Sequence, residues 1–317
     1  MPLMNAGRLG QIQLYRRLIQ DGPFNIQIAL VWPWYGIQGK QLDITTTPRF
    51  PLPTAVILPP CDPIKDQPRN PDIKSFPMVS FQTRFDICWT DQDTIAYPND
   101  LTAEQDALAN YSLIYEYFRT LVVGSAAPFF PALDTLTDQV VDLAGVAPRL
   151  EDFDRTLLRV TTCDGLDVVA MGNLSALATF WHACYDRGVN AEMWERMAPA
   201  CVGGQFERPT AFIKHARFYV NELIPNRVLQ PGGQTVTNLY FMQLGATGDF
   251  GTGKGVFGII PEPRVGNMFV RRELEGQFNA DTTVNTTRSV FWSLPAGVAV
   301  GAKRSLSVLK DFEVVPF

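Results

Sequence analysis

The sequence is poor in the residues that metal sites and nucleic-acid binders depend on. It holds two histidines, His182 and His215, which lie too far apart to be local ligands. No run of Lys or Arg could follow a phosphate backbone, and the formal net charge is -5. No apolar run approaches the ~18 residues of a membrane span. These gaps argue against a zinc site of local ligands, specific nucleic-acid binding and a membrane protein.

The cysteines and the N-terminus favour a reducing compartment. The first ten residues, MPLMNAGRLG, lack the apolar core of a secretory signal. The cysteines form no C-x-x-C pair, so we expect free thiols in a chain made in the cytosol. With 317 residues, of which 46% are hydrophobic, the chain can bury a real core in one large mixed domain or two ordinary ones. The five cysteines are Cys61, Cys88, Cys163, Cys184 and Cys201.

The most strongly patterned stretch runs from Thr102 to Val123, TAEQDALANYSLIYEYFRTLVV. Thr102 and Gln105 fit a capping box at its start, and Gly124 stands where a left-handed residue ends a helix. Apolar residues recur at steps of three and four, which predicts an amphipathic helix of about six turns and roughly 32 Å. We expect this helix to be the spine of the molecule. Its predicted buried face is Leu108, Tyr111, Ile114 or Tyr115, Phe118, and Leu121 or Val122.

An extended segment precedes this helix. Prolines crowd residues 33–98, and those from Pro48 to Pro77 exclude regular helix up to Met78. Two β-prone stretches flank a turn at Gly39 and Lys40. A solvated linker would not carry the large apolar residues that follow, so we expect an extended loop that meets a partner surface. These residues include Phe50, Ile57 and Phe76.

Alternating and continuous apolar patterns predict strands. Apolar and polar residues alternate from Val79 to Ile95, which predicts a strand that leads into the long helix. The run Leu166 to Met171 is apolar at nearly every position, as in a strand buried on both faces. After residue 205 most of the chain is strand-like. The predicted strands are Arg217 to Leu223, Asn238 to Leu244, Val256 to Ile260, Met268 to Leu274, Ser289 to Leu294, Val298 to Lys303 and Leu306 to Leu309.

Two shorter helices are predicted in the middle of the chain. The first spans Leu150 to Val160, with an acidic cap near its start at Glu151 or Asp152. The second spans Leu174 to Arg187, where Asn173 is the N-cap and Gly188 the closing residue. The mixture of these helices with the strands around them predicts an α+β fold.

One glycine-rich segment imitates a phosphate-binding loop. Residues 248–254 fit G-x-x-x-x-G-K, but Gly255 replaces the Ser or Thr that would hold magnesium. The strand-like residues that follow leave no helix N-terminus for a phosphate. We therefore interpret the segment as a turn between strands, and we predict that it binds no nucleotide.

Other candidate sites also have simpler structural readings. The pair His182 and Cys184 lacks zinc-ligand spacing, and no Ser or Cys lies in a G-x-S-x-G context. Trp32, Trp34 and Tyr35 could form a sugar or base platform, but packing against another strand or subunit is the simpler reading. We predict no catalytic residue, no metal site and no cofactor.

The order of these elements resembles the major capsid proteins of tailed bacteriophages, which have the Hong Kong 97-type fold. The resemblance implies an N-terminal arm (1–25), an extended β-hairpin loop (34–78) and a peripheral domain with its β-sheet and spine helix (79–129). It further implies a mixed α/β axial domain (130–287) and a return to the peripheral domain (288–317). The ending SVFWSLPAGVAVGAKRSLSVLKDFEV resembles the closing strands of the family.

This resemblance implies a structural protein of the virion rather than an enzyme. Identical subunits would self-assemble, in the host cytoplasm, into pentamers and hexamers of an icosahedral head that encloses double-stranded DNA. Scaffold, portal and decoration proteins are implied partners, while packaged DNA would be touched only by non-specific contact. Encapsulin nanocompartment shells share the fold and are the alternative; a soluble enzyme is a further one.

Contacts between subunits are expected from the arm and the extended loop. Some family members join a loop lysine to an asparagine of a neighbour, with a glutamate as catalyst. Lys40, Lys65 and Lys74 cannot be matched to that chemistry, nor can a partner such as Asn285, so we expect a shell without covalent cross-links. The candidate contact residues are Arg16, Arg17, Trp34, Tyr35, Lys40, Phe50, Ile57 and Phe76.

Overall fold

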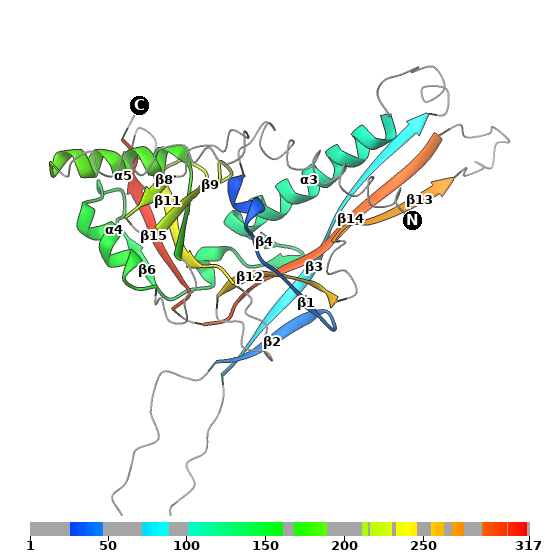
Figure 1. Ribbon diagram of the computed structural model, residues 1–317, viewed down its shortest axis with the longest axis horizontal. Helices are drawn as coiled ribbons and strands as arrows, with labels where there is room; N and C mark the ends of the chain where they lie inside the picture. Colours follow the sequence, from blue (N-terminus) through cyan, green and yellow to red (C-terminus); the bar gives the residue numbers. More distant parts are fainter. Residues whose placement is uncertain are drawn as a thin grey trace, which may run out of the picture.

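The molecule has a compact part and an extended part. Figure 1 shows the compact part with helices α4 (Leu150–Leu157) and α5 (Leu174–Asp186), and the extended part in which helix α3 (Leu101–Val123) runs along strands β3 (Asp72–Cys88) and β14 (Thr287–Val300). The computed structural model describes residues 26–46, 72–88, 101–160, 168–188, 211–214, 216–229, 233–245, 255–262, 268–275, 287–302 and 304–315.

The extended part is built on a six-stranded sheet with the order β1-β12-β14-β3-β2, in which β13 also pairs with β14. Its long central strand, β14, pairs antiparallel with β3, β12 and β13. From Ser80 to Asp86 of β3 every second side chain is exposed and those between are half-buried, as the alternating sequence pattern predicts. The remaining strands are β1 (Trp34–Ile37), β2 (Gln41–Thr46), β12 (Val256–Pro261) and β13 (Val270–Glu275).

Strand β3 begins earlier than the sequence pattern predicts. The pattern places its start at Val79, whereas the structure starts it at Asp72 and continues it through Pro77. The earlier start is due to β2, which pairs with residues 72–77 in an antiparallel register. A hydrogen-bonded neighbour can hold a proline-containing segment extended, and such pairing leaves no local mark on the sequence.

Strand β14 is one element, although two separate strands were predicted at 289–294 and 298–303. Pro295 lies in the gap between the two predicted strands, but it pairs with Ser80 within an unbroken ladder to β3. On its other side β14 pairs with β13 as far as Ser293 and with β12 from Gly297 onward. A residue without an N–H therefore falls between these two ladders, where the sheet tolerates it.

The compact part is built on a seven-stranded sheet with the order β6-β15-β11-β7-β9-β8, in which β10 also pairs with β11. All five residues of β7 are buried, as the continuous apolar run predicts. β14 belongs to the six-stranded sheet and β15 to the seven-stranded sheet, so the last two strands of the chain contribute to both parts of the molecule. The strands are β6 (Val140–Asp142), β7 (Val168–Gly172), β8 (Ala211–Ile213), β9 (Ala216–Val220), β10 (Arg227–Val228), β11 (Thr235–Gln243) and β15 (Leu306–Glu313).

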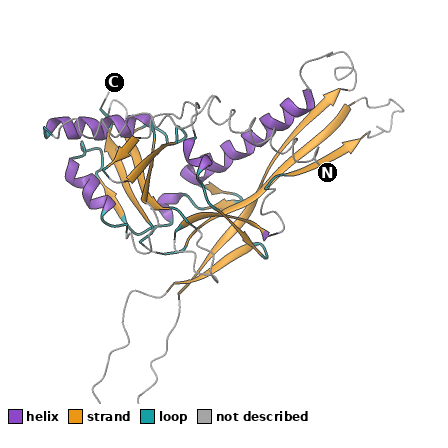
Figure 2. Ribbon diagram, in the orientation of Figure 1, coloured by secondary structure: helices purple, strands orange, loops and turns teal. Residues whose placement is uncertain are grey.

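Helices α4 and α5 lie together beside this sheet, as the purple ribbons of Figure 2 show. Between them and the sheet is an apolar core that includes Phe153, Phe180 and Phe312. The predicted cap of α5 is confirmed, because the Ala176 N–H donates to Asn173 Oδ1 at 2.9 Å. At α4 the carboxylate of Asp152 accepts the Arg149 N–H at 2.8 Å, so the acidic residue caps from inside the first turn.

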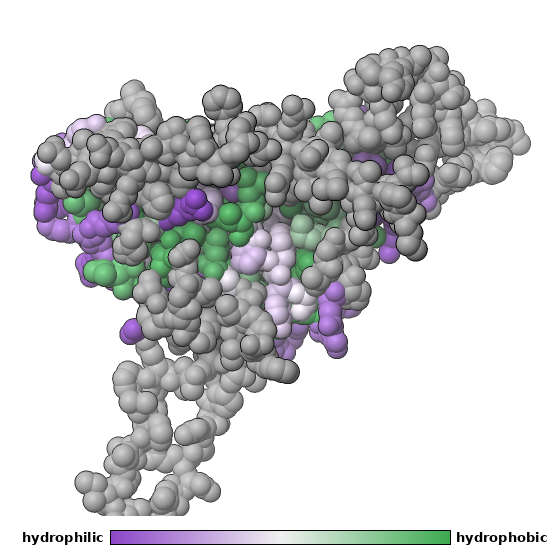
Figure 3. All heavy atoms as spheres, viewed as in Figure 1, coloured by the Kyte–Doolittle hydropathy of each residue, from purple (hydrophilic) through white to green (hydrophobic). Residues whose placement is uncertain are grey.

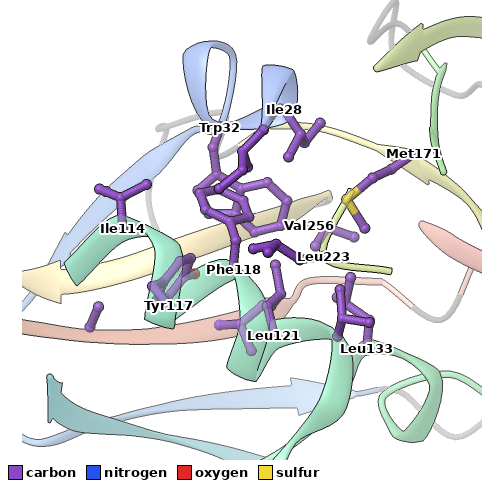
Figure 4. Packing of buried hydrophobic residues seen from close by; sticks show 14 of the residues in the cluster. Ile28, Trp32, Ile114, Tyr117, Phe118, Leu121, Leu133, Met171, Leu223 and Val256 are labelled. Carbon is purple, nitrogen blue, oxygen red and sulfur yellow. The ribbon is translucent and has the colours of Figure 1, made fainter. Parts of the chain in front are cut away.

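Helix α3 connects the two parts and is longer than any other described helix. It ends as predicted: Gly124 has φ +77 and donates its N–H to the Thr120 carbonyl at 2.7 Å. A 3₁₀ turn, η1 (Gln27–Leu30), supplies Ile28 and Ala29 to the core on which the inner end of α3 packs. Figure 4 shows Phe118 and Leu121 of α3 pointing into this core towards Trp32 and Val256.

The predicted buried face of α3 is correct except at Leu108. Tyr111, Phe118 and Leu121 are 8%, 0% and 0% exposed, whereas Leu108 is 45% exposed. Tyr117, which the pattern left out, is fully buried and donates its hydroxyl to the Gly297 carbonyl at 3.0 Å. An α-helix has 3.6 residues per turn, so apolar residues at steps of three and four are compatible with more than one buried face. The strands that pack against the helix determine which of these faces is buried.

Three short elements follow α3. A minimal hairpin of β4 (Ser125–Ala126) and β5 (Phe129–Phe130) anchors Phe130 in the same core, and the turn η2 (Leu133–Thr135) follows it. The predicted residues 89–95 of the first long strand and the glycine-rich segment 248–254 lie outside the described residues. The α+β class expected from the sequence is confirmed by these two sheets and their helices.

Candidate assembly surfaces

The base of the extended loop is a rigid hairpin. β2 and β3 pair from Gln41 with Pro77 to Thr46 with Asp72, and Gly39, with φ +107, makes the turn that precedes β2. A small apolar cluster under this base includes Ile37, Phe76 and Phe257. This pair of strands therefore rests on a packed foundation, and residues 47–71, which join the two strands, lie outside the described residues.

The candidate contact residues differ in how far they are exposed on the subunit. Lys40 is exposed at the turn before β2. Trp34 and Tyr35 are half-buried: Trp34 lies 5.0 Å from the ring of Tyr117, and Tyr35 lies 5.8 Å from that of Phe257, measured between ring centroids. The candidates Arg16, Arg17, Phe50 and Ile57 lie outside the described residues.

Phe76 has a different role from the one expected. Its side chain is only 3% exposed and packs into the apolar cluster beneath the hairpin. Phe76 therefore stabilises the foundation of the loop within its own subunit and presents no free surface for a neighbour. The alternation of the sequence could not reveal this, because the covering residues come from β1 and β12, far along the chain.

Trp32 is a core residue rather than part of a ligand platform. Trp32 is 4% exposed and makes edge-on contacts with Tyr117 and Phe118 at centroid distances of 6.5 and 5.5 Å. Such T-shaped pairs are the favoured packing of buried rings. A sugar or a base has no open ring face at Trp32 to stack on.

A polar cluster joins α3 to the strands beneath it. Asp106 of α3 accepts a hydrogen bond from Trp292 Nε1 at 3.0 Å and forms an ion pair with Arg271 Nε at 3.1 Å. Arg271 also pairs with Glu273 and lies 5.9 Å from the Trp292 ring centroid. No sequence pattern indicates this cluster, because Asp106 lies 165 positions from Arg271 and 186 positions from Trp292.

A second ion pair lies on the opposite, solvent-facing side of the same sheet. Arg84 pairs with Asp86 at 3.1 Å, and the Ser289 hydroxyl donates to Asp86 at 2.5 Å. These donors hold the pKa of Asp86 below its usual range, the Ser289 hydrogen bond most and the Arg84 hydrogen bond next. Alternate side chains of β3 thus give the sheet one polar face and one face towards α3.

Several apolar side chains are exposed on the subunit. In Figure 3 hydrophobic residues, in green, gather where the compact part meets the foot of α3. Phe129, 63% exposed, stands at the tip of the β4–β5 hairpin, and Val123, 61% exposed, at the end of α3. Sequence reasoning did not single these out. A short turn carries no period from which exposure could be read.

The described residues hold no group of three or more His, Cys, Asp or Glu side chains that could bind a metal ion. His182 lies on the surface of α5 beside Asp186 at 3.2 Å. Cys184 is a free, buried thiol whose pKa is raised by burial. His215 lies outside the described part of the chain. None of the helices in the described segments is long and apolar enough to cross a membrane.

No protein-family model and no curated protein sequence matches the chain. Solved structures do match it over nearly its whole length. The holo-SrpI encapsulin complex from Synechococcus elongatus PCC 7942 has a TM-score of 0.64 at 19% identity, covering 92% of this chain and 88% of that one. The capsid of a native GTA particle has a TM-score of 0.60 at 11% identity, covering 90% of each chain.

A third structure, also a capsid, agrees with these two. The capsid of Cyanophage P-SCSP1u has a TM-score of 0.51 at 9% identity, covering 88% of this chain and 86% of that one. The chain has the Hong Kong 97-type fold. The division of the chain into an arm, an extended loop, a peripheral domain and an axial domain stays a prediction.

Proposed function

We propose that this chain is the structural subunit of an icosahedral shell, and specifically the major capsid protein of a phage head that encloses double-stranded DNA. The observation that carries the proposal is the match of nearly the whole chain to shell subunits. The β2–β3 pair supports it as well, because its base is packed against the sheet and its two strands are joined by the 25 residues from 47 to 71. Such an arm adds contact area on a neighbour without adding to the subunit core.

The packing of the subunit indicates which part keeps its shape and which part adapts to neighbours. Pentamers and hexamers place each copy in slightly different surroundings, so the contacts must adapt while the body keeps its shape. The body here is stiff because α3 and both sheets share one large apolar core. We assign the adaptable contacts to residues 1–25 and to the loop beyond Thr46, including the candidates Arg16, Arg17, Phe50 and Ile57.

Assembly should depend on the extended loop, while folding should not. The test deletes residues 47–71 and joins Thr46 to Asp72 through Asn-Gly, because these two residues already pair across the hairpin. The shortened protein should unfold at nearly the same temperature as the full chain, since loop backbone contributes little to a core. Electron microscopy should show no closed shells. Complete particles from the shortened chain would contradict the assignment.

We also expect the shell to lack covalent cross-links, which is tested on particles assembled from the full-length wild-type chain. Boiled denaturing gels of assembled protein should show a single band at the subunit mass. A ladder of linked subunits would contradict this expectation. If the wild-type protein forms neither shells nor capsomers, and instead remains a monomer or small oligomer on a sizing column, the shell proposal itself fails and a soluble enzyme becomes the better reading.

An encapsulin-type compartment is the second candidate, favoured by the higher TM-score and identity of the encapsulin match. The two differ in what is needed for closure. A phage head of this kind would use separate scaffold and portal proteins, with decoration proteins added outside, and would be assembled in the host cytoplasm. Uniform closed shells from the chain expressed alone would favour the encapsulin. Nuclease-resistant DNA within particles from the native source would favour the phage head.

A further inference from the structure

The two halves of α3 are held by different kinds of interaction. The inner half, residues 113–123, contains its large, fully buried side chains, among them Tyr117, Phe118 and Leu121, each 0% exposed. In the outer half, residues 105–112, the buried hydrophobic side chains are Ala109 at 6% and Tyr111 at 8%. The inner half is therefore part of the main core, while the outer half has much less apolar anchorage.

The outer half contacts the strands beneath it through the polar cluster at Asp106. One carboxylate oxygen of Asp106 accepts from Trp292 Nε1 at 3.0 Å and from Arg271 Nε at 3.3 Å, and the other lies 3.1 Å from the same Arg271 atom. Arg271 is held in turn by Glu273 and lies over the Trp292 ring. Three donor–acceptor contacts thus converge on one side chain of the helix, from two neighbouring strands.

The position of the cluster makes these contacts effective. The Asp106 side chain is 13% exposed and that of Arg271 30% exposed, compared with 46% and 56% for Asp86 and Arg84 on the open face of the sheet. Partial removal from water strengthens an ion pair and raises the cost of leaving one partner alone. Such contacts are also directional, so they fail together once the helix moves away from the strands.

We propose that the Asp106 cluster is a latch that holds the outer half of α3 on the sheet and can open while the inner half stays packed. Opening the latch would let α3 and the strands β13 and β14 take a second arrangement within a folded subunit. This consequence rests on the proposed function: subunits in a closed shell meet neighbours that are not identically placed, and a releasable outer half gives them a means of adjusting.

Hydrogen exchange on the full-length chain tests the latch. Asp106→Asn keeps the shape and an acceptor for Trp292 Nε1 but removes the charge that binds Arg271. Amides in residues 105–112 should exchange at least about tenfold faster, while those in residues 113–123 should be unchanged. Arg271→Gln, which breaks the pair from the sheet side, should give the same pattern. Asp86→Asn is the matched control, because it removes an exposed Asp–Arg pair from the same sheet.

The exchange experiment can support or overturn the latch. Faster exchange confined to the outer half in both latch variants, with the control unchanged, supports the latch. No change in the outer half shows that its apolar contacts suffice, and equal acceleration along all of α3 shows that the helix opens as one unit; either result overturns the proposal. All variants are compared in the same assembly state, so that contacts between subunits do not affect the comparison.

The shell itself gives a separate readout. If the latch sets the arrangement of the subunit, Asp106→Asn should assemble into particles with a wider range of diameters than the wild type or the Asp86→Asn control. Uniform wild-type-sized particles from Asp106→Asn would refute the role in assembly even if exchange is faster. Because exchange is measured within the subunit, a wild type that forms no shells would remove the proposed function without altering the result for the latch.

Discussion

Replacing Phe118 by alanine tests whether α3 is the centre of the subunit. Phe118 is fully buried, and its ring lies 5.5 Å from that of Trp32 and 5.2 Å from that of Tyr117, both at nearly right angles. Alanine would leave a cavity lined by these rings and by the aliphatic residues around them. The surroundings include residues of both sheets, so they cannot collapse readily into the space.

The expected loss of stability follows from this burial. A buried Phe removes roughly 200 Å² from water, which at about 25 cal/mol per Å² gives an upper value of ~5 kcal/mol. Phe→Ala substitutions in cores cost about 3–5 kcal/mol when the cavity persists. We expect about 4 kcal/mol for Phe118→Ala. Leu108, 45% exposed on the same helix, should cost only about 1 kcal/mol on replacement by alanine, because much of its side chain is already in water.

Urea unfolding of unassembled protein, followed by tryptophan fluorescence and by helical circular dichroism, measures both variants against the wild type. The Leu108→Ala control lies in the same helix, and both substitutions introduce alanine, the best helix former, so neither loses stability through helix propensity and the losses report burial. Equal losses for Phe118→Ala and Leu108→Ala would refute the reasoning. A small loss for Phe118→Ala alone would remove α3 from the centre of the subunit.

Three smaller perturbations follow from single contacts. Tyr117→Phe should lower the free energy of unfolding by about 1–2 kcal/mol, because the buried Gly297 carbonyl loses its donor; urea titration would show the shift. Ala144→Gly should raise thermal stability by about 0.5–1 kcal/mol, since the exposed Ala144 has φ 48, where glycine is unstrained. The pKa of Glu151 is lowered by hydrogen bonding to Arg187, so its stabilising effect is present above its usual pKa and lost as pH falls through the folded value; Glu151→Gln should make the acid limb of a stability–pH curve shallower.

The sequence by itself determined the local features of the fold. The end of α3 at Gly124, the cap of α5 at Asn173 and the fully buried strand β7 were all predicted correctly. Each of these depends on residues within about four positions of one another, where backbone geometry and capping chemistry act directly. The α+β class and the general order of elements follow from the same local signals.

The tertiary structure alone decided how these pieces meet. β14 pairs with β3, about 200 positions away, and this ladder carries the strand past Pro295, where local rules predicted a break. The burial of Tyr117 in place of Leu108, the burial of Phe76 and the Asp106 cluster likewise depend on which strands lie beneath each residue. A local period shows that a face can be buried, but only long-range packing determines which residues on it lose contact with water.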